Sequence, residues 1–130
     1  MFKRIAVISA VLVIFAVSAI SASAQWESLG SKEVKDRSEQ DTWNASGKGE
    51  FRRIKLAVQH RPVRFYRLKV TFENGQVQEI EIRNLIRAGG ETRAIDLVGN
   101  DRRIDKVEVW YEAHTVRRGV RSQVTLYGFR

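Results

Sequence analysis

The sequence predicts an all-β fold: a single antiparallel β-sandwich of seven to eight strands, jelly-roll or immunoglobulin-like, preceded by a signal peptide. Apolar and polar residues alternate with a period of two in many runs, and no segment keeps the period of an amphipathic helix. Turn residues separate these runs about every ten residues, as in sandwiches and barrels. Residues 25–130 suffice for one domain with a single core and are too few for two.

Residues 1–24 have the features of a secretory signal peptide. Lys3 and Arg4 are followed by an uncharged, mostly apolar stretch over residues 5–20, and an Ala-Ser-Ala pattern ends at Ala24. We therefore expect cleavage between Ala24 and Gln25. An uncleaved membrane anchor is the alternative, but a span needs about 20 apolar residues. The leader indicates a bacterial protein, periplasmic or secreted, that meets the membrane only through this peptide before cleavage.

The first strands of the domain are predicted with unequal clarity. Two weaker candidates are Gln25–Val34 and a stretch around Thr42-Trp43, and the most polar segment, Ser38–Gly49, is expected to be a loop. Phe51–His60 alternates clearly between apolar and polar residues. Its inward positions are Ile54, Leu56 and Val58.

A central hairpin is predicted at Asn74-Gly75, because this pair favours a two-residue type I′ turn. A regular register would then place Val70 opposite Glu79, which does not suit a half-buried sheet. We therefore expect a β-bulge near Gln78. The shifted register pairs Val70 with Ile80, Leu68 with Ile82 and Lys69 with Glu81. The inward residues before the turn are Tyr66, Leu68, Val70 and Phe72, and Phe65 falls on the polar side.

Three further strands are predicted in the second half of the chain. Alternation marks a strand around Ile95 and Leu97, another over Val107–Glu112, and a last one around Val124 and Leu126. In the second of these, Trp110 points away from the core, opposite to its apolar neighbours.

Several local patterns resemble a family of small, uncharacterised secreted bacterial proteins that share a domain of unknown function. The matching pieces span residues 25–130 and are Trp26-Glu27-x-Leu29-Gly30, Asp41-Thr42, Phe51-x-x-Ile54-x-Leu56, Asn74-Gly75, Gly89-Gly90-Glu91-Thr92-Arg93-x-Ile95-Asp96-Leu97, Arg103-Ile104-x-x-Val107 and Tyr127-Gly128. The resemblance implies an exported β-sandwich-like domain. It carries no activity, because none of these pieces is a chemical signature.

The composition disfavours most catalytic chemistry. The absence of cysteine excludes disulfides, thiolate zinc sites, iron–sulfur clusters and cysteine nucleophiles. His60 and His114 are too few for a zinc site, and no cofactor is expected. A hydrolase with paired carboxylates is the less favoured alternative, because most acidic residues alternate with apolar ones, as on a solvated sheet face. These acidic residues are Glu79, Glu81, Asp96, Asp101, Asp105, Glu108 and Glu112.

The segment Gly89–Arg93 has two alternative interpretations. Successive amides at its glycines could hold an anion. However, phosphate-binding loops normally open a helix, whereas a strand follows here. We therefore expect a strand connection with glycine turn chemistry, and we expect Asp96 to anchor an arginine rather than perform chemistry.

The chain is basic, with 23 Lys plus Arg, 15 Asp plus Glu and a formal net charge of +8. No acidic residue follows Glu112, so the loop containing Arg117, Arg118 and Arg121 is the leading candidate for an anion-binding surface. Lys55, Arg67 and Lys69 would share an outer face if their two strands are neighbours. Alternatively, Glu73, Glu79 and Glu81 neutralise these cations across strands.

Trp110 on the outer face can stack on a sugar ring or mark a protein interface. Alternatively, Trp26 or Leu29 of the N-terminal segment covers it in a second core layer. The leading hypothesis is a non-catalytic envelope or extracellular binding module for an anionic polymer or glycan, using Arg117, Arg118, Arg121 and Trp110. The alternative is a protein-interaction subunit that docks on another envelope protein by a sheet edge or an aromatic surface. Sequence-specific nucleic-acid binding is not expected.

Overall fold

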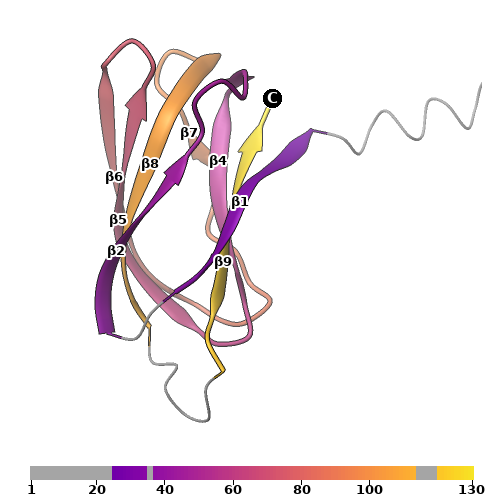
Figure 1. Ribbon diagram of the computed structural model, residues 1–130, viewed down its shortest axis with the longest axis vertical. Coiled ribbons are helices and arrows are strands. Elements are labelled where there is room, and N and C mark those ends of the chain that lie inside the picture. The colour runs from indigo at the N-terminus through magenta and orange to yellow at the C-terminus, as the bar shows by residue number, and fades with distance from the viewer. Residues whose placement is uncertain (1–24, 35–36, 114–119) are drawn as a thin grey trace, which may run out of the picture.

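The computed structural model describes residues 25–34, 37–113 and 120–130, which form two antiparallel sheets packed face to face (Figure 1). One sheet has four strands in the order β1-β9-β4-β7. The other follows the path β2-β8-β5-β6, with β3 also paired to β8. The predicted all-β sandwich is confirmed. Within these three ranges there is no helix that could cross a membrane.

Seven of the described strands have seven or more residues, and two have only two. The strands are β1 (Trp26–Glu33), β2 (Arg37–Asn44), β3 (Glu50–Phe51), β4 (Arg53–Gln59), β5 (Val63–Phe72), β6 (Val77–Ile86), β7 (Ile95–Asp96), β8 (Arg102–Ala113) and β9 (Gln123–Phe129). The weaker strand candidate Gln25–Val34 is therefore confirmed as β1. The loop expected over Ser38–Gly49 is wrong for its first half, because β2 runs to Asn44.

Alternation places the core between the two sheets. Ile54, Leu56 and Val58 of β4 are buried as expected. The largest fully buried side chains are Trp43, Tyr111, Phe51, Phe65 and Phe72. The polar segment β2 still forms a strand because its inward residue Trp43 is anchored in the core. Trp43 donates its indole N–H to the Gly30 carbonyl oxygen at 3.1 Å, which links β2 to β1 in the opposite sheet.

The predicted register of the central hairpin is wrong, because the turn is longer by one residue. The Phe72 N–H donates to the Gln76 carbonyl oxygen at 2.8 Å, and Gly75 has φ +90°. This is a three-residue loop with glycine in the left-handed position, so Thr71 pairs with Val77 and Val70 with Gln78. No bulge forms at Gln78.

Gln78 instead occupies an inward position with its side chain satisfied. Its Nε2 donates to the Asp96 carbonyl oxygen, and its Oε1 accepts from the Val98 N–H, both at 3.0 Å. The amide therefore bridges the margin of the two sheets, where β6 faces the segment that follows β7.

The strand order separates two basic groups that were predicted to share an outer face if their strands were neighbours. Lys55 lies on β4 in the four-stranded sheet, whereas Arg67 and Lys69 lie on β5 in the other sheet. They do not share an outer face. Cross-strand neutralisation occurs instead, since Arg67 Nη1 lies 3.3 Å from Glu79 Oε1 and Lys69 is registered with Glu79 rather than Glu81.

Candidate functional site

The candidate site lies on the outer face of the five-stranded sheet, where β5 and β6 both depart from regular pairing. Against β8, Phe65 is registered with Tyr111 and Arg67 with Trp110, so Tyr66 is an extra residue. Phe65 is fully buried, whereas Tyr66 is 36% exposed. The expected orientations of these two aromatic residues are therefore reversed, because the bulge changes the alternation of the strand.

The neighbouring strand bulges at the same level. Phe65 is registered with Asn84 and Arg67 with Glu81, so Ile82 and Arg83 together stand opposite Tyr66. Arg83 has φ +47°, a left-handed backbone conformation that is uncommon for a side chain of this kind. Bulges re-aim side chains and are frequent next to functional sites. Here they bring Tyr66, Arg67 and Arg83 to one depression.

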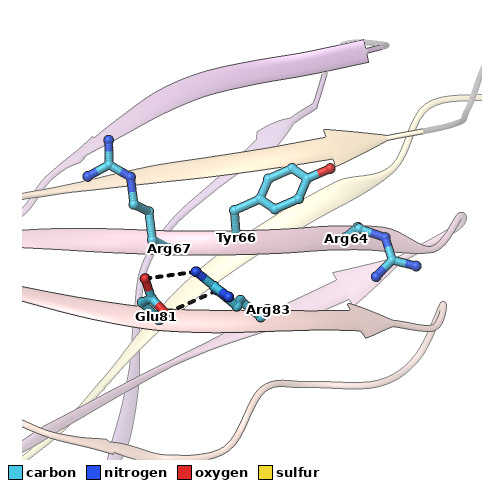
Figure 2. A pocket seen from close by; sticks show the side chains of 5 residues that line it. All are labelled: Arg64, Tyr66, Arg67, Glu81 and Arg83. Atoms are coloured by element: carbon cyan, nitrogen blue, oxygen red, sulfur yellow. Dashed lines mark hydrogen bonds and ion pairs between the residues drawn. The ribbon is translucent and has the colours of Figure 1, made fainter.

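This depression has a volume of about 400 Å³ and is lined by Arg64, Tyr66, Arg67, Glu81 and Arg83 (Figure 2). Arg83 forms a two-point pair with Glu81, with Nε to Oε2 at 3.0 Å and Nη2 to Oε1 at 3.3 Å. Arg64 makes no ion pair with any described residue. In Figure 2, Arg64 and Arg67 extend on either side of Tyr66.

Trp110 fixes the position of Arg67. The guanidinium carbon Cζ lies 3.8 Å from the centroid of the half-buried indole ring. Such a cation–π contact restrains the arginine without using its N–H donors.

A second depression of about 540 Å³ also reaches Tyr66, and it is lined by Glu39, Gln40, Tyr66, Trp110 and Tyr111.

Tyr66 is held by a short hydrogen bond. Its hydroxyl donates to Oε2 of Glu112 at 2.6 Å. This hydrogen bond favours the protonated phenol and raises the pKa of Tyr66 above its usual value of 10.0, with a smaller contribution from the nearby negative charge of the carboxylate. The ring is therefore neutral at physiological pH and tethered to β8.

The arginine side chains of this face are of the type that can bind anions. Arginine side chains suit carboxylate, sulfate and phosphate groups, which they can bind in a bidentate manner. Among the described residues, no group of three His, Asp or Glu side chains is placed to hold a metal ion.

The carboxylates considered for hydrolysis mostly bind their own neighbours. Asp96 pairs with Arg53 at 3.0 Å, as expected for an anchor, and Asp101 pairs with Arg52 at 2.9 Å. On the five-stranded sheet, the acidic residues engaged by nearby side chains are Glu79, Glu81, Glu108 and Glu112.

The Gly89–Arg93 segment is a strand connection, as preferred from the sequence. The Gly89 N–H donates to the Val58 carbonyl oxygen and the Thr92 N–H to that of Leu56, both at 2.8 Å. The Gly90 N–H donates to the Arg87 carbonyl oxygen, also at 2.8 Å. These amides are therefore not directed at an anion.

The structure brings together only part of the predicted site. Trp110 lies on the outer face, and neither Trp26 nor Leu29 covers it. The ring centroid of Trp26 lies 5.0 Å from that of Phe129, and Leu29 is buried in the core. Arg121 is exposed and lines neither depression. The remaining predicted positions, Arg117, Arg118, His114 and Ala24, lie outside the described residues. Gln25 is described, and its carbonyl oxygen accepts from the Arg130 N–H at 3.2 Å.

Three residues of this depression were not predicted as site residues: Arg64, Tyr66 and Arg83. One signal for the bulge was present in the chain. The apolar residues Val63 and Phe65 occupy odd positions, whereas Leu68, Val70 and Phe72 occupy even ones. This change of phase within one strand marks an inserted residue.

A second aromatic group lies on the outer face of the four-stranded sheet. Lys55 Nζ lies 4.1 Å from the ring centroid of Trp26 and 5.8 Å from that of Tyr127, and it pairs with Glu91 Oε1 at 3.1 Å. The Lys55 side chain is only 16% exposed. Its charge is therefore satisfied within the chain.

Comparisons with known proteins identify a family without assigning an activity. No curated protein sequence matches the chain. A solved structure described as the structural and functional characterization of Pseudomonas aeruginosa AlgX is similar over 82% of this chain, at 12% identity and a TM-score of 0.46. The chain spans only 27% of the length of that AlgX chain. The family model "Domain of unknown function (DUF2541)" matches residues 6–128, so the chain belongs to this family.

Proposed function

We propose that this protein is an exported, non-catalytic binding module for an anionic saccharide of the cell envelope or the extracellular space. The observation that carries the proposal is the pair of aligned bulges in β5 and β6, which directs Tyr66, Arg67 and Arg83 to one depression. The signal-peptide pattern of residues 1–24 supports export to the periplasm or the medium.

The residue types favour a charged sugar over a simple ion. Guanidinium groups bind the acidic group, and the tyrosine and tryptophan side chains combine an apolar ring with a polar edge. Gln40 of the adjoining depression uses its Nε2 for contacts within the sheet, so it offers a sugar hydroxyl group its Oε1 as an acceptor. A mixed surface of this kind suits a ligand with alternating charged and hydrogen-bonding groups.

Titration of the purified protein with polygalacturonate and with uncharged dextran, each at two salt concentrations, tests the proposal. We expect polygalacturonate to bind and the affinity to fall as salt rises, with no binding of dextran. Arg67→Ala should weaken binding at least about tenfold, which corresponds to one lost charge-assisted contact. Arg53→Ala is the matched control, because Arg53 also contacts an aromatic ring and a carboxylate, but on the opposite sheet.

The loop arginines Arg117, Arg118 and Arg121 remain a prediction as a second basic surface. An Arg117/Arg118/Arg121→Ala variant belongs in the same titration. If this variant loses binding while Arg67→Ala retains it, the ligand lies on the loop and not on the sheet face. If the unaltered protein does not bind polygalacturonate, the proposed function is wrong.

The second candidate is a protein-interaction subunit. The observation that favours it is the aromatic surface of Trp26, Tyr127 and Phe129 on the four-stranded sheet. Affinity capture from an envelope extract tests it. One stoichiometric partner that is lost in a Trp26→Ala/Tyr127→Ala variant supports docking, whereas equal recovery with that variant rejects this surface.

A further inference from the structure

We infer that the site reads two successive acidic groups of one glycan chain, one on each side of Tyr66, so that it selects acidic oligosaccharides over single acidic sugars. This inference rests on the proposed function and specifies its ligand. It follows from the order of the side chains along β5, where a cation, an aromatic ring and a second cation succeed one another at Arg64, Tyr66 and Arg67 (Figure 2).

The spacing of the two cations suits a chain ligand. Arg64 is registered with Glu112 and Arg67 with Trp110, so the two arginines are two residues apart along β8 and three along β5. At about 3.3 Å per strand residue, their Cα atoms are roughly 7–10 Å apart. Their side chains diverge on either side of Tyr66 in Figure 2, so a single carboxylate does not bridge them. A sugar ring between two acidic groups can lie over the tyrosine.

The two arginines differ in how they are occupied. Arg67 Cζ lies 3.8 Å from the ring centroid of Trp110, and Arg67 Nη1 lies 3.3 Å from Glu79 Oε1. A ligand carboxylate must therefore compete with Glu79. Arg64 has no acidic partner among the described residues. A single acidic sugar at Arg67 therefore gains less than it would at an unpaired arginine. A second acidic group on the same chain reaches Arg64 at a high effective concentration, and there it displaces no ion pair among the described residues.

The Tyr66 ring is suited to the position between the two charges. Its hydroxyl is tied to Glu112 at 2.6 Å, so the ring is held in place before the ligand arrives. Aromatic side chains that are fixed in advance lose little conformational entropy on binding.

Calorimetric titration with galacturonic acid and its di-, tri- and tetrasaccharides tests the inference. We expect the affinity to rise by at least about tenfold at the shortest oligomer that reaches both arginines, and to rise only gradually beyond it. Arg64→Ala, and Arg64→Gln as a second variant, should remove this step, so that the oligosaccharides bind each variant no more than about twofold more tightly than galacturonic acid does. Arg53→Ala should retain the step.

The two proposals fail in different ways. If the affinity rises in proportion to the number of acidic groups, in the unaltered protein and in Arg64→Ala alike, the two-point inference is wrong and the proposed function stands. If neither the unaltered protein nor Arg53→Ala binds any of these oligosaccharides, both proposals are wrong.

Discussion

Arg83 sits in the middle of a strand with φ +47°, a conformation that costs an L-residue roughly 1–2 kcal/mol relative to the right-handed region. Its ion pair with Glu81 offsets little of this cost, because both side chains are largely exposed. Strain of this kind is often retained where the side chain has a function.

We therefore predict that Arg83→Gly is more stable than Arg83→Ala by about 1 kcal/mol in the free energy of unfolding, measured by urea denaturation. Both variants lose the same guanidinium group, so the difference between their free energies of unfolding reports the backbone strain at position 83. Both should also bind polygalacturonate more weakly than the unaltered protein. Equal stabilities for the two variants would show that the backbone at position 83 is not strained.

The hydrogen bond between Tyr66 and Glu112 gives the site a titration at alkaline pH. The pKa of Tyr66 is raised above 10.0 in the folded protein, so this hydrogen bond stabilises the fold, and its contribution is fully present below pH 10.0. The contribution is lost as the pH rises through the folded-state pKa.

The tyrosinate absorbance of the protein, minus that of Tyr66→Phe, should show a midpoint above pH 10.0. In Glu112→Gln the midpoint should shift towards 10.0, since the carboxylate acceptor is gone. An unchanged midpoint in Glu112→Gln would mean that another group determines the pKa.

At the scale of the strands, the sequence predicts most of the elements and less of their registers. Alternation locates β4, β8 and β9, because each keeps one phase over several residues. It fails at Tyr66 and in the Glu73–Gly75 turn, where one residue more or less moves every later side chain to the other face. The site depends on these deviations, so its arginines could not be grouped from the sequence alone.

Gly128 shows why one position in β9 needs glycine. Its backbone is not left-handed, but a Cβ atom there would lie 2.6 Å from Cδ1 and 2.8 Å from Cε1 of the fully buried Phe51 ring. We predict that Gly128→Ala lowers the free energy of unfolding by about 1–3 kcal/mol, as overpacking does in other cores.

The control is the same change in a Phe51→Leu background. The smaller side chain makes room for the methyl group, so Gly128→Ala should cost at least about 0.5 kcal/mol less there, as residues in contact show in double-mutant cycles. An equal cost in both backgrounds would mean that the ring is not the obstacle. Chemical denaturation of the four proteins gives the complete cycle.

At the scale of the whole molecule, the two outermost strands of the five-stranded sheet are both protected against pairing with another chain. In β2, Asp41 faces inward and accepts a hydrogen bond from the Tyr111 hydroxyl at 2.7 Å. In β6, the bulge at Arg83 interrupts the edge, and Arg93 Nη2 donates a hydrogen bond to the Glu81 carbonyl oxygen at 3.1 Å. Inward charges and bulges oppose edge-to-edge association. The broad sheet faces are therefore better candidates for binding than these edges.

The sandwich distributes its three tryptophans so that one spectroscopic experiment distinguishes the faces. Trp43 is buried in the core, Trp26 lies on the four-stranded sheet, and Trp110 lies under Arg67 on the five-stranded sheet. We expect a carboxylate ligand that draws the Arg67 guanidinium from Glu79 to alter the surroundings of the Trp110 indole alone.

We predict that polygalacturonate changes the tryptophan fluorescence of the unaltered protein and of Trp26→Phe by the same amount. In Trp110→Phe the change should be absent, while calorimetry should still detect binding, because the phenyl ring retains part of the contact with Arg67. A change that persists in Trp110→Phe and disappears in Trp26→Phe would place the ligand on the four-stranded sheet. The outer face of the five-stranded sheet would then have no part in binding, despite its paired bulges.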